Sequence, residues 1–201
     1  MPKLLLATRN SAKVREYSLL FQGVPFQLTT LADEGISMEV SEIGHTLEEN
    51  AKLKATAYAS GNRFLVVADD SGLEVDALGG EPGSLSARYA GKEATDKEKI
   101  ALLLSRLEGL PWERRSARFR CVIAIALDAK IVGLCEGECG GIITFEPRGD
   151  QGFGYDPIFY LPELGKTMAE FPMEEKNRVS HRGKAAQKAL QVLQHMWQEL
   201  S

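Results

Sequence analysis

Two adjacent carboxylates follow a short apolar run in the first half of the chain. Residues 64–68 are apolar and β-branched at their centre, which predicts a buried strand, and Asp69 and Asp70 come directly after it. We expect Gly72 to permit a turn where this strand ends. Buried carboxylates need a cationic partner, and Mg²⁺ with a phosphate-bearing substrate is the usual one. A turn that only ends the strand explains this motif equally well.

A candidate anion site lies where a predicted strand over residues 3–8 meets a predicted helix over residues 11–22. The first N–H groups of a helix and the positive end of its dipole favour a phosphate. Thr8 and Asn10 add neutral donors, and Lys13 adds a positive charge that is unfavourable in a first turn unless an anion binds there. Asn10 acting only as an N-cap is the commoner alternative.

The loop over residues 152–157 places glycines on both sides of an aromatic residue. Such a loop suits Phe153 as a stacking platform and Asp156 as a hydrogen-bond acceptor. An ordinary turn with a core phenylalanine is an equally good interpretation of this segment.

A basic cluster precedes the last predicted helix of a chain whose net charge is −4. A solvated basic face is the default explanation, but Gly183 beside His181 and Arg182 allows a ligand to approach the backbone. A run of arginines over residues 114–120 is expected to be surface or interface. The basic cluster consists of Lys176, Arg178, His181, Arg182 and Lys184.

Length and composition predict one domain over residues 1–201. The net charge of −4 argues against nucleic acid or a membrane surface as partner, and the longest apolar run, 121–127, is too short to span a bilayer. Three cysteines outline no disulfide framework, and no signal peptide is recognisable, so we expect a cytoplasmic protein. Neither a Walker A loop nor a G-x-G-x-x-G motif occurs.

Strand and helix patterns alternate along the chain and predict an α/β fold with a mixed sheet. Capping boxes at 46–49 and 95–98 begin two helices, a third helix runs from 180 to 200, and residues 128–130 connect a hairpin. The predicted strands are Lys3–Thr8, Phe64–Ala68, Arg118–Leu127, Ile131–Glu138 and Pro157–Tyr160.

Together these segments resemble the inosine triphosphate pyrophosphatase family, which hydrolyses deaminated purine nucleoside triphosphates, and its bacterial dITP/XTP pyrophosphatase branch above all. One departure is Arg9, where the family commonly has glycine. The matching stretches, in order, are 7–13, 46–51, 68–78, 86–91, 152–159, 175–176 and 180–183.

The resemblance implies an elongated mixed sheet flanked by helices, with two lobes and a central substrate cleft, and a homodimer. It further implies Mg²⁺-dependent cleavage between the α- and β-phosphates of ITP, dITP or XTP. Asp70 resembles the family's general base, and Glu42 and Asp70 its metal ligands. The implied substrate-binding residues are Thr8, Arg9, Asn10, Ser11, Ala12, Lys13, Lys54, Ser71, Phe153, Gly154, Tyr155, Asp156, Lys176, His181 and Arg182.

Two alternatives stay open. A Maf-like pyrophosphatase acting on other nucleotides is disfavoured by the segment 180–183. A nucleotide-binding regulator without catalysis is disfavoured by the pair Asp69 and Asp70, because a protein that only binds a polyanion should avoid adjacent negative charges.

Overall fold

The computed structural model describes residues 1–61 and 64–200 and confirms the predicted α/β class. Seven strands form one mixed sheet in the order β2-β1-β3-β4-β5-β6-β7; β1 pairs in parallel with β2 and β3, whereas β6 pairs antiparallel with β5 and β7. The strands are β1 Lys3–Leu6, β2 Gln27–Thr30, β3 Leu65–Val75, β4 Ser116–Leu127, β5 Lys130–Ile143, β6 Phe159–Leu161 and β7 Lys166–Thr167, and the helices are α1 Ser11–Leu20, α2 Leu47–Ala59, α3 Asp96–Arg106, α4 Met173–Val179 and α5 His181–Leu200.

The chain divides into two compact units. Unit 1 comprises Met1–Asp70, Cys121–Gly137 and Arg182–Ser201, and unit 2 comprises Ser71–Arg120 and Glu138–His181. The long strands β3, β4 and β5 therefore contribute residues to both units. Among the described helices, none combines the length and the apolar character that crossing a bilayer requires.

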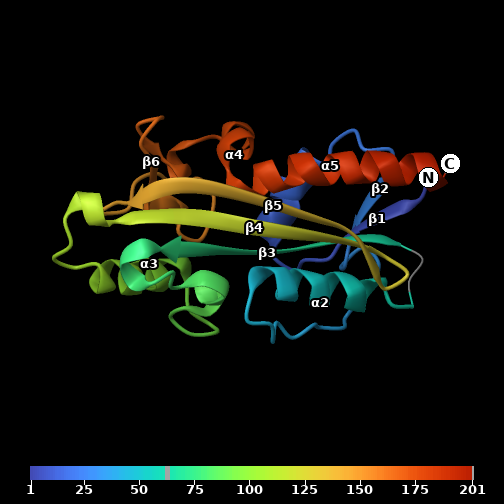
Figure 1. The fold of residues 1–201 in the computed structure, drawn as a ribbon, viewed down its shortest axis with the longest axis horizontal. Helices are drawn as coiled ribbons and strands as arrows, with labels where there is room; N and C mark the ends of the chain where they lie inside the picture. Colours follow the sequence, from blue (N-terminus) through green and yellow to red (C-terminus); the bar gives the residue numbers. More distant parts are fainter. Residues whose placement is uncertain (62–63, 201) are drawn as a thin grey trace. The chain divides into compact units, whose positions relative to one another are not determined.

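The core of unit 1 has two sides because successive side chains of a strand point to opposite faces. Leu65 and Val67 pack in one cluster with residues of α1 and α5, and Val66 and Ala68 pack in another with residues of α2. Helices α2 and α5 accordingly lie on opposite faces of the unit 1 strands (Figure 1).

The core of unit 2 forms around α3 and the strands that continue into this unit. Leu103 of α3 and Leu107, the C-cap of this helix, are fully buried. On the strands, the rings of Phe119 and Phe159 have centroids 4.4 Å apart. Burial of large aromatic side chains is a major source of stability for a core of this kind.

Local sequence signals are confirmed at several element ends. Thr46 and Thr95 each form a capping box with the glutamate three residues later, at the starts of α2 and α3. The predicted hairpin lies between β4 and β5, where Asp128 and Ala129 adopt φ values of 49° and 60°. Such positive φ angles are those of the tight turns that match the twist of two hairpin strands.

The predicted end of the strand before Asp69 is wrong. β3 continues through Asp69, Asp70 and Gly72 to Val75. Gly72 is needed for close approach and not for a turn, because a Cβ there would lie 2.2 Å from the carbonyl oxygen of Gly83. Asp and Gly are poor strand formers, so tertiary packing overrides local propensity here.

Other differences concern short elements. The strands β2 and β7 and the helix α4 were not predicted, and residues 157–158, the start of the strand predicted at Pro157–Tyr160, lie in a 3₁₀ turn before β6. Elements of two to seven residues offer too few positions for a period of 2.0 or 3.6 to show.

We expect Gly72→Ala to lower the free energy of unfolding by about 1–3 kcal/mol, because the backbone around Gly83 must move to accept the new methyl group. Gly140→Ala in β5 is the matched control, since a Cβ there meets nothing within 4 Å. Urea unfolding followed by circular dichroism measures both. Equal stability of the two variants would contradict the close approach.

Candidate active site

The two adjacent carboxylates of β3 point to opposite faces of the strand. Asp69 follows Leu65 and Val67 on the face covered by α1 and α5, and Asp70 follows Val66 and Ala68 on the face covered by α2. Continuation of the strand past Asp70 thus separates the carboxylates, which the expected turn would have kept together.

Asp69 is neutralised by cations of two helices. Lys13 Nζ lies 2.7 Å from Asp69 Oδ2, and Arg182 Nε lies 3.8 Å from the same oxygen. Burial raises the pKa of Asp69, but Lys13, Arg182 and Lys54 outweigh this effect and hold that pKa at about 2. Asp69 is therefore ionised at neutral pH.

Asp70 has a different environment. Its Oδ2 accepts a hydrogen bond from Asn50 Nδ2 at 3.0 Å, and its Oδ1 lies 4.0 Å from Lys54 Nζ. Burial raises the pKa of Asp70 above the usual range, the nearby Glu42 carboxylate adds to the increase, and Lys54 and Lys13 oppose it only in part. A carboxylate with a raised pKa is a better proton acceptor, as a general base requires.

Glu42 and Lys54 extend the site around Asp70. Lys54 Nζ donates to Glu42 Oε1 at 2.5 Å, so one ammonium group lies close to both predicted metal ligands. Burial lowers the pKa of Lys54, but the carboxylates of Asp69, Asp70 and Glu42 raise it more, and Lys54 stays protonated at neutral pH. Asn50 Oδ1 also accepts from the Gly44 N–H at 2.8 Å, which fixes its side-chain amide.

The predicted anion loop precedes α1. Asn10 is the N-cap, and its Oδ1 accepts from the N–H groups of Ala12 and Lys13 at 2.9 and 3.2 Å. Thr8 Oγ1 accepts from the Asn10 N–H at 3.2 Å. The capping interpretation is therefore confirmed, and phosphate binding by this loop stays a prediction.

Arg9 connects the anion loop to another segment of unit 1. Its Nη2 donates to the carbonyl oxygens of Ile36 and Met38 at 2.9 and 3.0 Å. Met38 O also accepts from Tyr58 Oη of α2 at 3.0 Å. The residue that departs from the family pattern thus fixes the segment leading to Glu42.

Arg182 is buried between acidic and aromatic side chains. Its Nη1 donates to Glu16 Oε2 at 2.6 Å, and its guanidinium lies 5.9 Å from the ring centroid of Tyr17. Nearby, Cys121 Sγ lies 3.7 Å from Tyr17 Oη and 3.9 Å from Asp69 Oδ2. Two cations and two carboxylates compensate one another here, as buried charges require.

Unit 2 contains the predicted aromatic loop. Asp156 Oδ2 accepts from Lys176 Nζ at 2.5 Å and from the Phe153 N–H at 2.8 Å, and Lys176 Nζ lies 4.9 Å from the Phe153 ring centroid. Gly152 has φ +76°, and a Cβ there would lie 2.1 Å from Asp156 Oδ2. Glycine is thus required at 152 for both conformation and space.

His181 is also in unit 2. Its ring is buried and stacks on Phe119, with centroids 4.7 Å apart and an interplanar angle of 13°. Tyr155, on the aromatic loop, donates from Oη to the Ser86 carbonyl at 3.0 Å, and Ser71 lies in β3.

The predicted site residues fall into two groups, each within one unit. Carboxylates and lysines suited to phosphate chemistry gather in unit 1, and the aromatic loop with its buried ion pair lies in unit 2. The first group is Thr8, Arg9, Asn10, Ser11, Ala12, Lys13, Glu42, Lys54, Asp70 and Arg182, and the second is Ser71, Phe153, Gly154, Tyr155, Asp156, Lys176 and His181.

The Ham1 family model matches residues 4–192. The chain belongs to this family. The resemblance inferred from the sequence motifs is confirmed. A dITP/XTP pyrophosphatase of Geobacillus kaustophilus is 48% identical over 200 residues, covering 100% of this chain and 96% of the relative, and one of Bacillus subtilis is 44% identical over 194 residues, covering 96% and 98%.

Solved structures of Ham1 proteins agree with the fold. A HAM1 protein from Coxiella burnetii has a TM-score of 0.87 and 41% identity, covering 97% of this chain and 100% of that one. The Staphylococcus aureus Ham1 protein has a TM-score of 0.85 and 38% identity, covering 96% and 99%. The mixed sheet flanked by helices is thus the fold of the Ham1 family.

Two partners of the site were missed by sequence reasoning. Asn50 lies four residues before Lys54 on α2, and Glu16 lies three residues after Lys13 on α1. Helical spacing could have indicated Asn50, because residues four apart share a helix face. Glu16 gave no signal, since its partner Arg182 lies 166 residues away.

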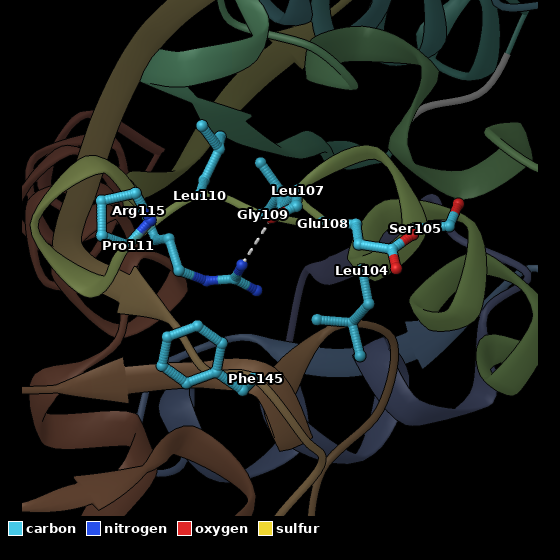
Figure 2. Close-up of a pocket in the computed structure, with 9 residues that line it drawn as sticks. All are labelled: Leu104, Ser105, Leu107, Glu108, Gly109, Leu110, Pro111, Arg115 and Phe145. Carbon is cyan, nitrogen blue, oxygen red and sulfur yellow. Dashed lines mark hydrogen bonds between the residues drawn. The ribbon is translucent and has the colours of Figure 1, made fainter.

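Unit 2 also contains a pocket of about 460 Å³ at the C-terminal end of α3, where apolar side chains such as Leu104, Leu110 and Phe145 surround Arg115 (Figure 2). The expectation that Arg115 lies on the surface is wrong. Its guanidinium is buried and donates to the carbonyls of Leu107, Ile143 and Thr144 at 2.7–2.9 Å. Arg115 thus donates to a carbonyl group at the C-terminal end of α3, where a positive charge interacts favourably with the helix dipole.

We expect Asp69→Asn to make stability less sensitive to acid. The folded-state pKa of about 2 lies below the ordinary value, so this carboxylate stabilises the fold above pH ~4 and loses that effect as pH falls toward 2. The free energy of unfolding should therefore fall less between pH 5 and pH 3 in the variant than in the wild type. Asp128→Asn, at an exposed hairpin position, should keep the wild-type slope.

We expect Arg9→Ala to loosen the segment before Glu42, because two hydrogen bonds to its backbone are lost. Amide hydrogen exchange of peptides covering residues 34–42 should become several-fold faster. Arg15→Ala, which removes an exposed arginine of α1, is the control. Unchanged exchange in Arg9→Ala would show that Arg9 does not hold this segment.

Proposed function

We propose that this protein hydrolyses deaminated purine nucleoside triphosphates, such as dITP, ITP and XTP, to the monophosphate and pyrophosphate. Relatives 44–48% identical along nearly the whole chain carry the name dITP/XTP pyrophosphatase. The observation that carries the mechanism is the pair of opposite pKa shifts on one strand, low at Asp69 and raised at Asp70. When the pKa values of two neighbouring carboxyl groups shift in opposite directions, one group supplies a fixed negative charge and the other a base.

Glu42 and Asp70 are the residues that would hold Mg²⁺. The fit rests on the donor set: both carboxylates approach the ammonium of Lys54, so the site already favours a cation between them. Mg²⁺ typically binds one or two carboxylates together with substrate phosphates and waters. When bound, the ion would neutralise charge on the phosphates that are cleaved.

Asp70 accepts a proton from the water that attacks the α-phosphorus. Asn50 donates to Oδ2 of this carboxylate and so fixes the orientation of the group. Lys54 and Lys13 stabilise negative charge on the phosphates, and the start of α1 adds backbone N–H groups. Asp69 holds Lys13 in a fixed position through its 2.7 Å contact.

Residues of the aromatic loop and the last helix bind the purine. Phe153 stacks on the base, while His181 and Arg182 donate to its 6-oxo group. Adenine presents an amino donor at that position, so donors would face each other without an acceptor. Unpaired buried donors of this kind support discrimination of about 10⁴-fold.

The two units work as a single pyrophosphatase domain over residues 1–201, in a cytoplasmic homodimer. These statements follow from the family resemblance. Light scattering after size exclusion tests the dimer, and a monomeric mass at micromolar concentration would contradict it.

The decisive assay measures pyrophosphate release from dITP, ITP, XTP, GTP and ATP, with and without Mg²⁺. We expect efficient turnover of the first three only, and only with the metal. Equal rates with ATP would refute the base selectivity, and no pyrophosphate from any substrate would refute the activity.

We expect Asp70→Asn to lower kcat by at least about 10²–10⁴-fold, because the variant lacks the base and one metal-binding charge while it keeps the shape. Nucleotide binding, measured by calorimetry, should change much less. Asp128→Asn again serves as the control that removes a carboxylate elsewhere. A kcat near the wild-type value in Asp70→Asn would show that Asp70 is not the general base.

A further inference from the structure

The aromatic loop of unit 2 is held at one peptide unit by groups on both sides. The carbonyl of Phe153 accepts from the Asp156 N–H at 3.3 Å. The N–H of the same peptide, that of Gly154, donates to Asp96 Oδ2 at 2.6 Å. Because a peptide is planar, fixing both its C=O and its N–H fixes the backbone that carries the Phe153 ring.

Asp96 is itself firmly oriented. It is the first residue of α3, directly after the Thr95 cap, and its other oxygen accepts from Lys99 Nζ at 2.6 Å. Each oxygen of the carboxylate thus has one specific partner, one within the helix and one 58 residues away in the loop. The hydrogen bond to Gly154 is charge-assisted, the stronger class of hydrogen bond.

We propose that Asp96 is a positioning residue for recognition of the purine base: it orients the Phe153–Gly154 peptide and thereby the ring of Phe153. This inference rests on the proposed function, in which Phe153 stacks on the base. Helix α3, to which neither the motifs nor the mechanism gave a role, becomes the support of the base-binding loop.

A second hydrogen bond of the loop limits the effect that we expect from removing the Asp96 side chain. Tyr155 Oη donates to the Ser86 carbonyl at 3.0 Å, so the loop stays attached when Asp96 is lost. The backbone before Tyr155 gains freedom, because φ is positive at both Gly152 and Gly154 and glycine populates many conformations. Base binding then has to order the loop again, which weakens the complex.

The test compares three variants in the full-length protein. Asp96→Ala should raise KM for ITP about 5- to 10-fold with kcat within about twofold, since a stacking contact acts equally in the ground and transition states. Asp96→Asn retains an acceptor oxygen and should recover most of the affinity. Glu93→Ala removes one exposed negative charge just before α3 and should match the wild type.

Two further measurements distinguish a loss of loop orientation from a general disturbance of the fold in Asp96→Ala. Inhibition by inorganic tripolyphosphate, which has no base, should be unchanged in Asp96→Ala, and amide exchange of residues 150–157 should be faster. An unchanged KM for ITP, or an equal loss of affinity for tripolyphosphate and ITP, would overturn the proposal. Wild-type protein that fails to hydrolyse ITP, dITP and XTP would instead refute the proposed function.

Discussion

The alternation of side chains along β3 is the constraint on which the chemistry of unit 1 depends. Two carboxylates that are neighbours in sequence face different helices, so each has its own nearest polar partners. Asp69 meets the cations of α1 and α5, whereas Asp70 meets the amide and ammonium of α2.

Local sequence rules predicted much of the fold. The capping boxes at Thr46 and Thr95 and the hairpin at Asp128 depend on residues close to one another in sequence, and these features and the predicted last helix are all present. The end of β3 was missed because its polar residues and glycine contradict strand propensity. Contacts with the segment after the strand hold it in place: the Gly83 backbone packs against Gly72, and Ser86 Oγ accepts from the Leu73 N–H.

The candidate site was also predicted only in part, because the sequence does not show which distant residues come together. Motif positions identified the charged residues, but their partners are set by tertiary structure. Arg182 was predicted as a substrate-binding residue, but its partner Glu16, far away in the chain, could not be inferred from the sequence. Arg115 was assigned to the surface or an interface together with Arg114, Arg118 and Arg120, although its carbonyl partners Leu107, Ile143 and Thr144 are set by tertiary structure.

The thiol of Cys121 has a consequence for the chemical durability of this site. Burial and the adjacent Asp69 raise the pKa of Cys121 to about 12, and the other two cysteines are buried as well. Alkylating agents and peroxide react with the thiolate, which is scarce at neutral pH when the pKa is this high. The Cys121 thiol beside Asp69 therefore stays protonated at neutral pH and reacts slowly with such reagents.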